Sequence, residues 1–507
     1  MDKRESTAGW GALEGGPLQA YVNVELRELL VLNPVNPRSM SAPLLNSPWS
    51  FGGNQIAPPD SAGEVEDTSP LRVMAFKLGL ILVFIRFSII HQLLTSLVHV
   101  NFYLLYLFGI PALLGVALAG GVQRTLRSRP AVYWAGFAIW LAVGAPFSSW
   151  RGGSIGGLSS YLRTDFPMLF VTAGLVYTWR ECRAMMYAIA WGAVAILFAG
   201  KMFQGDTGYY GERLTLNFGT ISNSNDYAGH LVLVLPFLLW AALTSKSKAI
   251  RLAALCGIPY GVLLVLKTAS RGALVALVAG ALFWLLRGSM RQRIALLALG
   301  PVVVVALVGF VPRSSLVRIL SFSAESADAS EEALESSEMR RHLLQESILY
   351  TLQHPLFGVG MEQFSNYEGI HSTLVGGLRG FWHETHNTYT QVSSECGIPA
   401  LALYLAGIVS TFLMLNRVYR RARGRPECQD IRTATFCIML ALVMYCTAIT
   451  FVNFAYFFYL PAMSSLAIAV SSAADKELNR PSLGPVESLP GFAPRQRWVP
   501  QRKPVSP

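Results

Sequence analysis

Twelve apolar segments dominate this chain, and each is close to the length that a helix needs to cross a lipid bilayer. About 20 apolar residues in a helix cover the ~30 Å hydrocarbon core of a membrane. The segments lie at 73–91, 101–121, 131–148, 164–179, 184–203, 226–244, 249–268, 272–287, 293–312, 397–416, 433–453 and 455–473. They predict an all-α fold, a polytopic transmembrane helix bundle of about 12 spans, in which the fourth and eighth segments are short.

The composition agrees with a membrane protein. Of the 507 residues, 52% are hydrophobic and only 14% are charged, whereas soluble domains carry about 25% charged residues. The net charge of +11 is spread in short Lys and Arg clusters between apolar segments, so we expect no nucleic-acid partner. The six cysteines show neither the density of a disulfide scaffold nor C-x-x-C metal spacing, and we expect them to be small buried residues.

The distribution of basic residues predicts the orientation in the membrane. Cytoplasmic loops of membrane proteins are enriched in Lys and Arg. With the N-terminus inside, the five short inner loops hold 17 of these residues and the short outer loops hold 6. We therefore expect both termini in the cytoplasm and the long loop 313–396, between spans 9 and 10, on the outer face.

The chain divides into a membrane domain at 71–473 and two polar ends. Residues 1–70 and the basic, Pro-rich residues 474–507 lack sustained periodicity and are predicted to be disordered and cytoplasmic. No basic region followed by an apolar core marks a secretory signal in the first ~70 residues.

The long outer loop contains one predicted helix, at 330–354, which stops before Pro355. One face of this helix is apolar. That face predicts that the helix lies on the membrane surface or against the bundle, and it is formed by Leu344, Ile348, Leu349 and Leu352.

Four segments carry polar side chains beside apolar runs at the outer face. They are ERLTLNFGTISNSNDYAG (212–229), SRG (270–272), HPLFGVGMEQF (354–364) and FWHETHNTYTQVSSECGIPALALYLAG (381–407). Charged and imidazole groups are costly in lipid, so a cluster at the mouth of a span usually has a function. Over roughly residues 200–415, these segments resemble the bacterial O-antigen ligase/polymerase family. In that family a periplasmic loop carries an H-N-x-Y element, and short outer loops carry essential arginines.

His383, Glu384 and His386 first suggest a metal site. Zinc proteases bind their metal through H-E-x-x-H, whereas the spacing here is H-E-T-H with no third ligand. No D-x-D pair on the outer face is present to hold a divalent cation against a diphosphate. We therefore expect no metal, and favour His386 as a general base with Glu384 or Asn387 orienting its ring or the sugar. The alternative is an exposed loop histidine without a role.

Six basic residues lie on the side that the charge bias disfavours, namely Arg151, Arg163, Lys201, Arg213, Lys267 and Arg271. The planar guanidinium of arginine suits phosphate oxygens. The family resemblance implies that Arg213 and Arg271 clamp a diphosphate. For the other four, snorkelling of the side chain to lipid phosphate is the favoured interpretation.

Other polar residues have two interpretations each. Arg340 matches a position where the family often has an arginine, and it either contacts substrate or is solvated at the surface. Asn225 either binds sugar hydroxyls or caps a helix. Tyr389 either stacks on a sugar or anchors the span at the interface.

Four residues have expected structural roles. Gly358 and Gly360 are expected to serve a turn. Glu395 and Gly397 match the family pattern at the entry to the tenth span, where packing is the expected role.

The resemblance implies a membrane glycosyltransferase of the bacterial inner membrane, with its active site on the periplasmic face. Its donor is a lipid-linked oligosaccharide on undecaprenyl diphosphate, and its acceptor is a hydroxyl on a glycan, lipid core or protein. The reaction needs no cofactor, nucleotide or metal. Ligase and polymerase differ only in the acceptor, and both remain open. A transporter of polysaccharide or lipid-linked glycan is the alternative, followed by a structural membrane protein.

Overall fold

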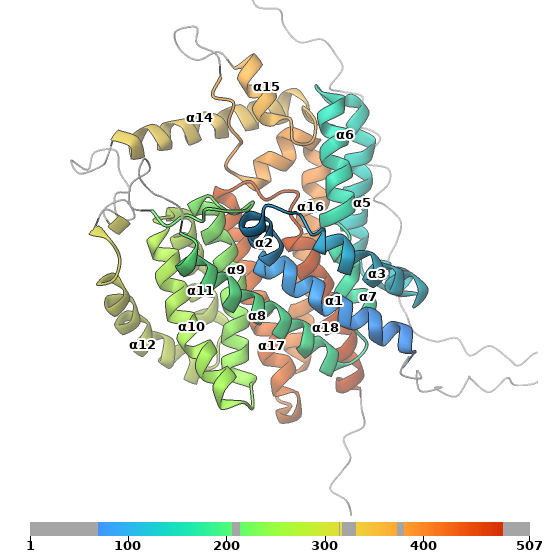
Figure 1. Ribbon diagram of the computed structural model, residues 1–507, viewed down its shortest axis with the longest axis vertical. Helices are drawn as coiled ribbons and strands as arrows, with labels where there is room; N and C mark the ends of the chain where they lie inside the picture. The colour runs from blue at the N-terminus through green and yellow to red at the C-terminus, as the bar shows by residue number, and fades with distance from the viewer. Residues whose placement is uncertain (1–68, 205–212, 314, 317–330, 373–379, 480–507) are drawn as a thin grey trace, which may run out of the picture. The chain divides into compact units, whose positions relative to one another are not determined.

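The computed structural model of the protein describes residues 69–204, 213–313, 315–316, 331–372 and 380–479 (Figure 1). All regular elements in this part of the chain are helices, apart from one isolated bridge between Gln204 and Leu216. The all-α fold is therefore confirmed. The predicted disordered ends fall largely outside the described residues, although the last helix continues past 473 to Leu478.

The helices follow one another in the order that Figure 1 shows. Their bounds are α1 (Pro70–Ser88), α2 (Ile90–Val98), α3 (Leu104–Leu118), α4 (Gly121–Leu126), α5 (Arg129–Gly144), α6 (Arg151–Ser160), the π-helix η2 (Tyr161–Asp165), α7 (Met168–Leu175), α8 (Trp179–Met202), α9 (Ser224–Thr244), α10 (Lys248–Lys267), α11 (Arg271–Arg287), α12 (Met290–Val308), α14 (Glu331–Gln353), α15 (Phe364–His371), α16 (Thr388–Arg421), α17 (Gln429–Ala448) and α18 (Tyr459–Leu478). Short 3₁₀ turns follow α5, precede α17 and follow α17.

Seven helices in the described residues are long and apolar enough to cross a membrane, or eight if one bent pair counts as a span. They contain α5, α8, α9, α10, α12, α16 and α17. The bent pair is α1 and α2, which meet at 69° where Ile89 has a φ of 55°. The segment predicted at 164–179 contains only the eight-residue α7. The figure of 12 spans stays a prediction.

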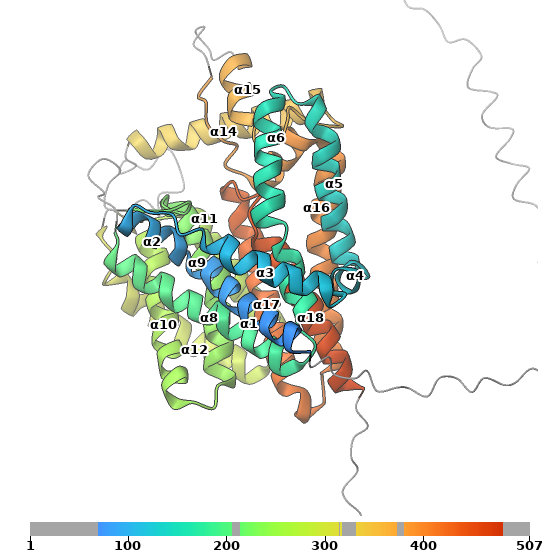
Figure 2. The same ribbon diagram turned by 45° about the vertical axis from the view of Figure 1, so that its right-hand side comes forward.

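The core of the bundle is formed around α9 and α17, which pack against each other. In α9, 83% of the most apolar window is buried, because α8, α10, α11 and α17 surround it (Figures 1 and 2). The most apolar part of α12 is not buried among the described residues, and its main contacts there are with α10 and α11. An apolar helix with such exposed side chains is suited to lipid contact.

A break inside α16 at Gly397 packs against a glycine-rich turn at 358–360. Gly358 and Gly397 have φ values of 66° and 85°, a region that favours glycine. A Cβ atom on Gly397 would lie 1.9 Å from the carbonyl oxygen of Leu356. The fully buried carboxylate of Glu395 accepts hydrogen bonds from the backbone N–H groups of Glu362 (3.0 Å) and Phe364 (3.2 Å). The expected turn and packing roles are confirmed.

The helix predicted in the long loop is confirmed as α14, which ends before Pro355. The inward side of α14 buries Leu343, Ser347 and Tyr350. The apolar face predicted from the sequence is instead exposed, and it comprises Leu344, Ile348, Leu349 and Leu352. This face therefore does not pack against the bundle, which leaves the membrane surface as its expected contact.

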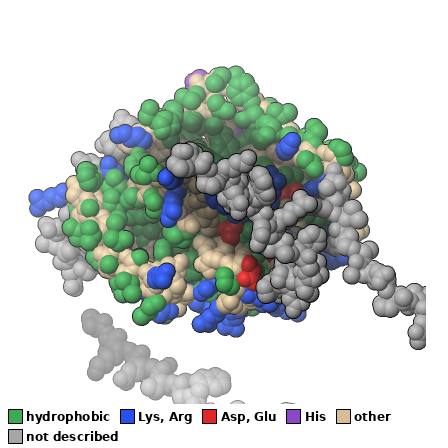
Figure 3. All heavy atoms as spheres, turned by 90° about the horizontal axis from the view of Figure 1, so that it is seen from below, with side chains coloured by type: hydrophobic (Ala, Val, Ile, Leu, Met, Phe, Trp, Pro, Cys, Tyr) green, Lys and Arg blue, Asp and Glu red, His purple; other side chains and the backbone are tan. Residues whose placement is uncertain are grey.

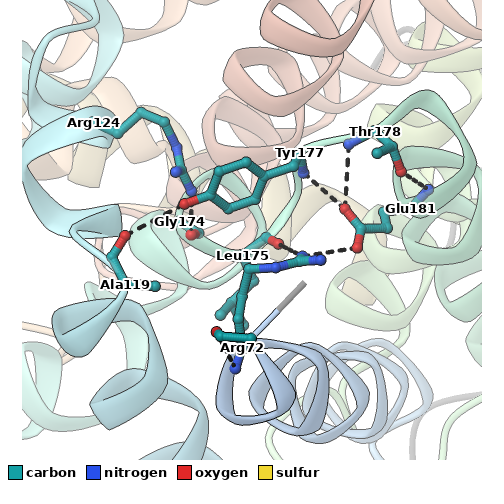
Figure 4. Close-up of polar contacts among 9 residues, drawn as sticks. Arg72, Ala119, Arg124, Gly174, Leu175, Tyr177, Thr178 and Glu181 are labelled. Atoms are coloured by element: carbon teal, nitrogen blue, oxygen red, sulfur yellow. Dashed lines mark hydrogen bonds and ion pairs between the residues drawn. The ribbon is translucent and has the colours of Figure 1, made fainter. Parts of the chain in front are cut away.

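Ion-pair and cation–π contacts join α1, α4 and α8 at the end of the bundle that is predicted to face the cytoplasm (Figure 4). Arg72 is buried and forms a 2.8 Å ion pair with Glu181. The guanidinium groups of Arg72 and Arg124 lie 4.9 Å and 3.8 Å from the centre of the Tyr177 ring. Figure 3 views the molecule from below, and Lys and Arg side chains lie at several places on that face. This pattern is typical of a cytoplasmic surface.

Candidate active site

Three helix N-termini meet at the other end of the bundle. Asn223, Ser270 and Asn387 cap α9, α11 and α16. The link between them is the segment 451–454. Thr388 Oγ1 donates to the carbonyl of Val452 (2.7 Å) and accepts from the N–H of Phe454 (2.9 Å). Cβ atoms on Gly272 of α11 and Gly229 of α9 would lie 2.6 Å from Phe451 and 3.2 Å from Phe454.

Arg213 connects the N-terminus of α9 with the C-terminus of α10. Its Nε donates to the carbonyl of Thr268 (3.0 Å), and its Nη2 donates to the side-chain oxygen of Asn225 (3.1 Å). Thr268 ends α10, and Arg271 is the first residue of α11 after a short turn. The structure thus brings Arg213 and Asn225 of the segment 212–229 to the turn that precedes Arg271, which belongs to a separate segment of the sequence.

The charge of Arg340 in α14 acts on His386 and on Asp226. Burial, together with the charge of Arg340 and the neighbouring His383, lowers the pKa of His386 to about 4. The positive charge of Arg340 also attracts the carboxylate of Asp226, which follows Asn225 in α9. We call Arg213, Arg271 and Arg340 the basic cluster. The charge of Arg340 acts on His386. The imidazole of His386 is therefore neutral at neutral pH, whereas its unperturbed pKa is near 6.5.

Two predicted substrate-binding residues have structural partners. The side-chain oxygen of Asn387 accepts from the N–H groups of Tyr389 (2.9 Å) and Thr390 (3.2 Å) at the start of α16. Tyr389 Oη donates to the carbonyl of Cys446 on α17 (2.8 Å). Both residues thus stabilise the start of α16, and the orienting role of Glu384 or Asn387 stays a prediction.

A cavity of about 660 Å³ is lined in part by Glu384, two residues before His386. It is lined by residues from the break between α1 and α2, the π-helix η2, the turn at 362, the loop before α16 and the segment 453–459. Its carboxylates are Asp165, Glu362 and Glu384, and we call it the acidic cavity. Its volume is within the range of ~300–1,000 Å³ that is usual for ligand pockets.

Arg86 is the one arginine of the acidic cavity. It is 8% exposed, forms an ion pair with Asp165, and its guanidinium carbon lies 4.0 Å from the centre of the Phe458 ring. Asp165 also accepts from the N–H of Phe458 (3.1 Å). The sequence analysis missed Arg86, although an arginine within the apolar run 73–91 is itself a signal of function.

The other carboxylates of the cavity are partly desolvated. Burial raises the pKa of Glu362, and the charge of Asp165 raises it further. Burial also raises the pKa of Glu384, where a hydrogen bond from Ser365 opposes the shift and the charge of Glu362 adds to it. Neither Glu362 nor Asp165 was predicted as a site residue, because neither lies in a recognisable motif.

Backbone strain marks the same region. Glu362, Trp382 and His386 have φ values of 59°, 59° and 52°, which are uncommon for residues other than glycine. Such strain persists where the surrounding structure enforces it, and it is concentrated at functional sites. Within the described residues no group of three or more His, Cys, Asp and Glu side chains is arranged to hold a metal. That the reaction needs no metal stays a prediction.

Comparison with known proteins supports the resemblance seen in the motifs. A search of curated proteins finds no match to the chain. A protein-family model described as O-antigen ligase matches residues 252–405, which include Arg271, Arg340, Glu384 and His386. Arg213 and Arg86 lie before this stretch and join it through the contacts described above. The resemblance is therefore confirmed over residues 252–405, which are similar to the O-antigen ligase family.

Proposed function

We propose that the protein transfers a glycan from undecaprenyl diphosphate to an acceptor hydroxyl at the periplasmic face of the bacterial inner membrane. The observation that carries this proposal is the convergence of Arg213, Arg271, Arg340 and His386 at one end of the helix bundle. Three of these residues lie in the stretch that matches the O-antigen ligase family.

The basic cluster suits a diphosphate for two reasons. Arginine donates several hydrogen bonds in a fixed plane and stays charged at all relevant pH values. In addition, Arg271 is the first residue of α11, whose N-terminus carries partial positive charge. Anions bind readily at such helix ends. The cluster would hold the donor by its diphosphate and stabilise the negative charge that develops as the diphosphate leaves.

His386 is the proposed general base. The oxygen of the acceptor hydroxyl attacks the anomeric carbon of the donor sugar, and the bond between this carbon and the diphosphate oxygen breaks. The proton of the hydroxyl passes to a ring nitrogen of His386, and the bonding electrons leave with the lipid diphosphate. The low pKa keeps the ring unprotonated before the reaction. A bound diphosphate would offset the charge of Arg340 and raise the pKa towards its ordinary value, which makes the ring a better base.

Replacement of His386 tests this function. General-base catalysis contributes about 10²–10⁴-fold to a rate, so His386→Ala should lose most transfer activity. His383→Ala is the matched control, because His383 is exposed in the same loop and the family motif aligns with the second histidine. The assay uses purified protein, a lipid-linked oligosaccharide donor and separation of the products on a gel.

Three outcomes are distinguishable. Loss of transfer in His386→Ala alone supports the proposal. Loss in His383→Ala alone assigns the base to the other histidine. Full activity of both variants contradicts general-base catalysis by this loop, and movement of the donor across a membrane without transfer would support the transporter instead. Ligase and polymerase are separated by the acceptor that restores transfer, either a lipid core or a second lipid-linked repeat.

A further inference from the structure

The acidic cavity has the mixture of groups that sugars require. Sugar hydroxyls both donate and accept hydrogen bonds. The cavity offers acceptors in Glu362 and Glu384, donors in Arg86, and amide groups in Gln391 and Asn453. Half-buried Phe457 also lines the cavity and presents an apolar ring. Ligand pockets of this kind combine an apolar wall with a few polar groups that fix orientation.

The charges of the cavity exclude a second phosphate site. Arg86 is already paired with Asp165. Glu362 and Glu384 form no ion pair with any residue in the part of the chain that the structure describes. An anionic ligand would therefore meet two carboxylates that no cation compensates. Like-charge contacts in a partly desolvated site weaken binding.

Two buried polar atoms on residues that line the cavity have no hydrogen-bond partner among the described residues. One is Nε of Arg86, whose side chain is 9% exposed, and the other is Oε2 of Glu384. A buried polar atom without a partner is costly, so such atoms usually bond to a ligand or to water.

We propose that the acidic cavity binds an uncharged, hydroxyl-bearing part of the glycan and selects against sugars that carry a carboxylate. The inference rests on the proposed function for the identity of the ligand as a glycan. Glu384 lies two residues before His386, so a glycan in the cavity is next to the proposed base. The diphosphate and the sugar then occupy separate regions of opposite charge.

Binding of trisaccharides tests the inference without any transfer reaction. The full-length protein is placed in nanodiscs of phosphatidylcholine, which has no net charge. Excess inorganic diphosphate occupies the basic cluster, and EDTA removes metal ions. The neutral probes are chitotriose, maltotriose and mannotriose, and the acidic probe is trigalacturonic acid. Dissociation constants are measured for the wild type, Glu362→Gln, Glu384→Gln and Glu427→Gln. Glu427 is exposed in the turn between α16 and α17, which makes Glu427→Gln a matched control.

The wild type should bind at least one neutral probe more tightly than trigalacturonic acid, by at least about tenfold. Glu362→Gln and Glu384→Gln should reduce the ratio of the two dissociation constants, acidic over neutral probe, by improving the binding of the acidic probe. Glu427→Gln should leave this ratio unchanged. Three results would overturn the inference: equal binding of acidic and neutral probes, no binding of any neutral probe, or a ratio unchanged in both Gln variants.

The test also separates this inference from the proposed function. If the protein shows no preference for neutral probes while transfer still depends on His386, only the sugar site is wrong. If the protein prefers neutral probes while His386→Ala transfers normally, only the proposed base is wrong.

Discussion

The basic cluster and the acidic cavity are neighbours at one end of the bundle, but they are built differently. The cluster comes from short motifs: Arg213 contacts Thr268 at the end of α10, Arg271 begins α11, and His386 lies in the loop before α16. The cavity is assembled from segments as distant as Arg86 and Tyr459. Charge also separates them, because the first region is positive and the second has an excess of carboxylates. The proposed diphosphate site therefore depends on residues of short motifs, whereas the proposed sugar site depends on contacts between distant segments.

The largest effect is expected from breaking the ion pair of the cavity. Arg86→Met would leave the carboxylate of Asp165 without its charged partner. Removal of one member of a buried pair typically costs about 3–5 kcal/mol of stability. Arg163→Met is the control, because Arg163 is exposed two residues before Asp165. Thermal unfolding of the purified proteins in detergent should show a much lower midpoint for Arg86→Met.

A second variant distinguishes charge from packing. Arg86→Met combined with Asp165→Asn removes both charges and should recover part of the lost stability. If Arg86→Met and Arg163→Met unfold at the same temperature, the Arg86–Asp165 pair does not support the cavity, and the contrast between the two regions loses its structural basis.

The same contrast explains what the sequence could predict. Most apolar segments became helices, and α14 ends before Pro355 as expected. Arg213 and Asn225 are in contact, in agreement with motifs that place both near the outer face. The cavity was not predicted, because Arg86 is hidden in an apolar run and Asp165 is placed by the π-helix η2. Such positions follow from contacts between distant segments, which hydropathy and short motifs do not contain.

A smaller effect concerns the pH dependence of transfer. A base is active when unprotonated, so activity falls as pH decreases through its pKa. For free His386 this pKa is about 4. Hence kcat/KM, which reports the free enzyme, should change less than about twofold between pH 7.5 and pH 5.5. An unperturbed histidine with a pKa of ~6.5 would lose about tenfold over the same range.

The profile of kcat sharpens this prediction. Since kcat reports the complex with substrate, its acid limb should lie at higher pH if a bound diphosphate offsets the charge of Arg340. Arg340→Gln should move the limb of kcat/KM to higher pH as well, because one cause of the low pKa is removed. A limb near pH 6.5 in both profiles of the wild type would contradict the neutral, buried state of His386.

The separation of diphosphate and sugar is tested most directly by the binding of undecaprenyl diphosphate, which carries no sugar. Arg213→Lys and Arg271→Lys keep the charge but remove the fork of donors. Each charge-assisted contact is worth about 1.5–3 kcal/mol, so each dissociation constant should rise about 10- to 100-fold. Glu384→Gln should leave the constant within about twofold, because Glu384 lines the acidic cavity. Equal weakening by Glu384→Gln, or unchanged binding by both Lys variants, would contradict the division of the site into a basic cluster for the diphosphate and an acidic cavity for the sugar.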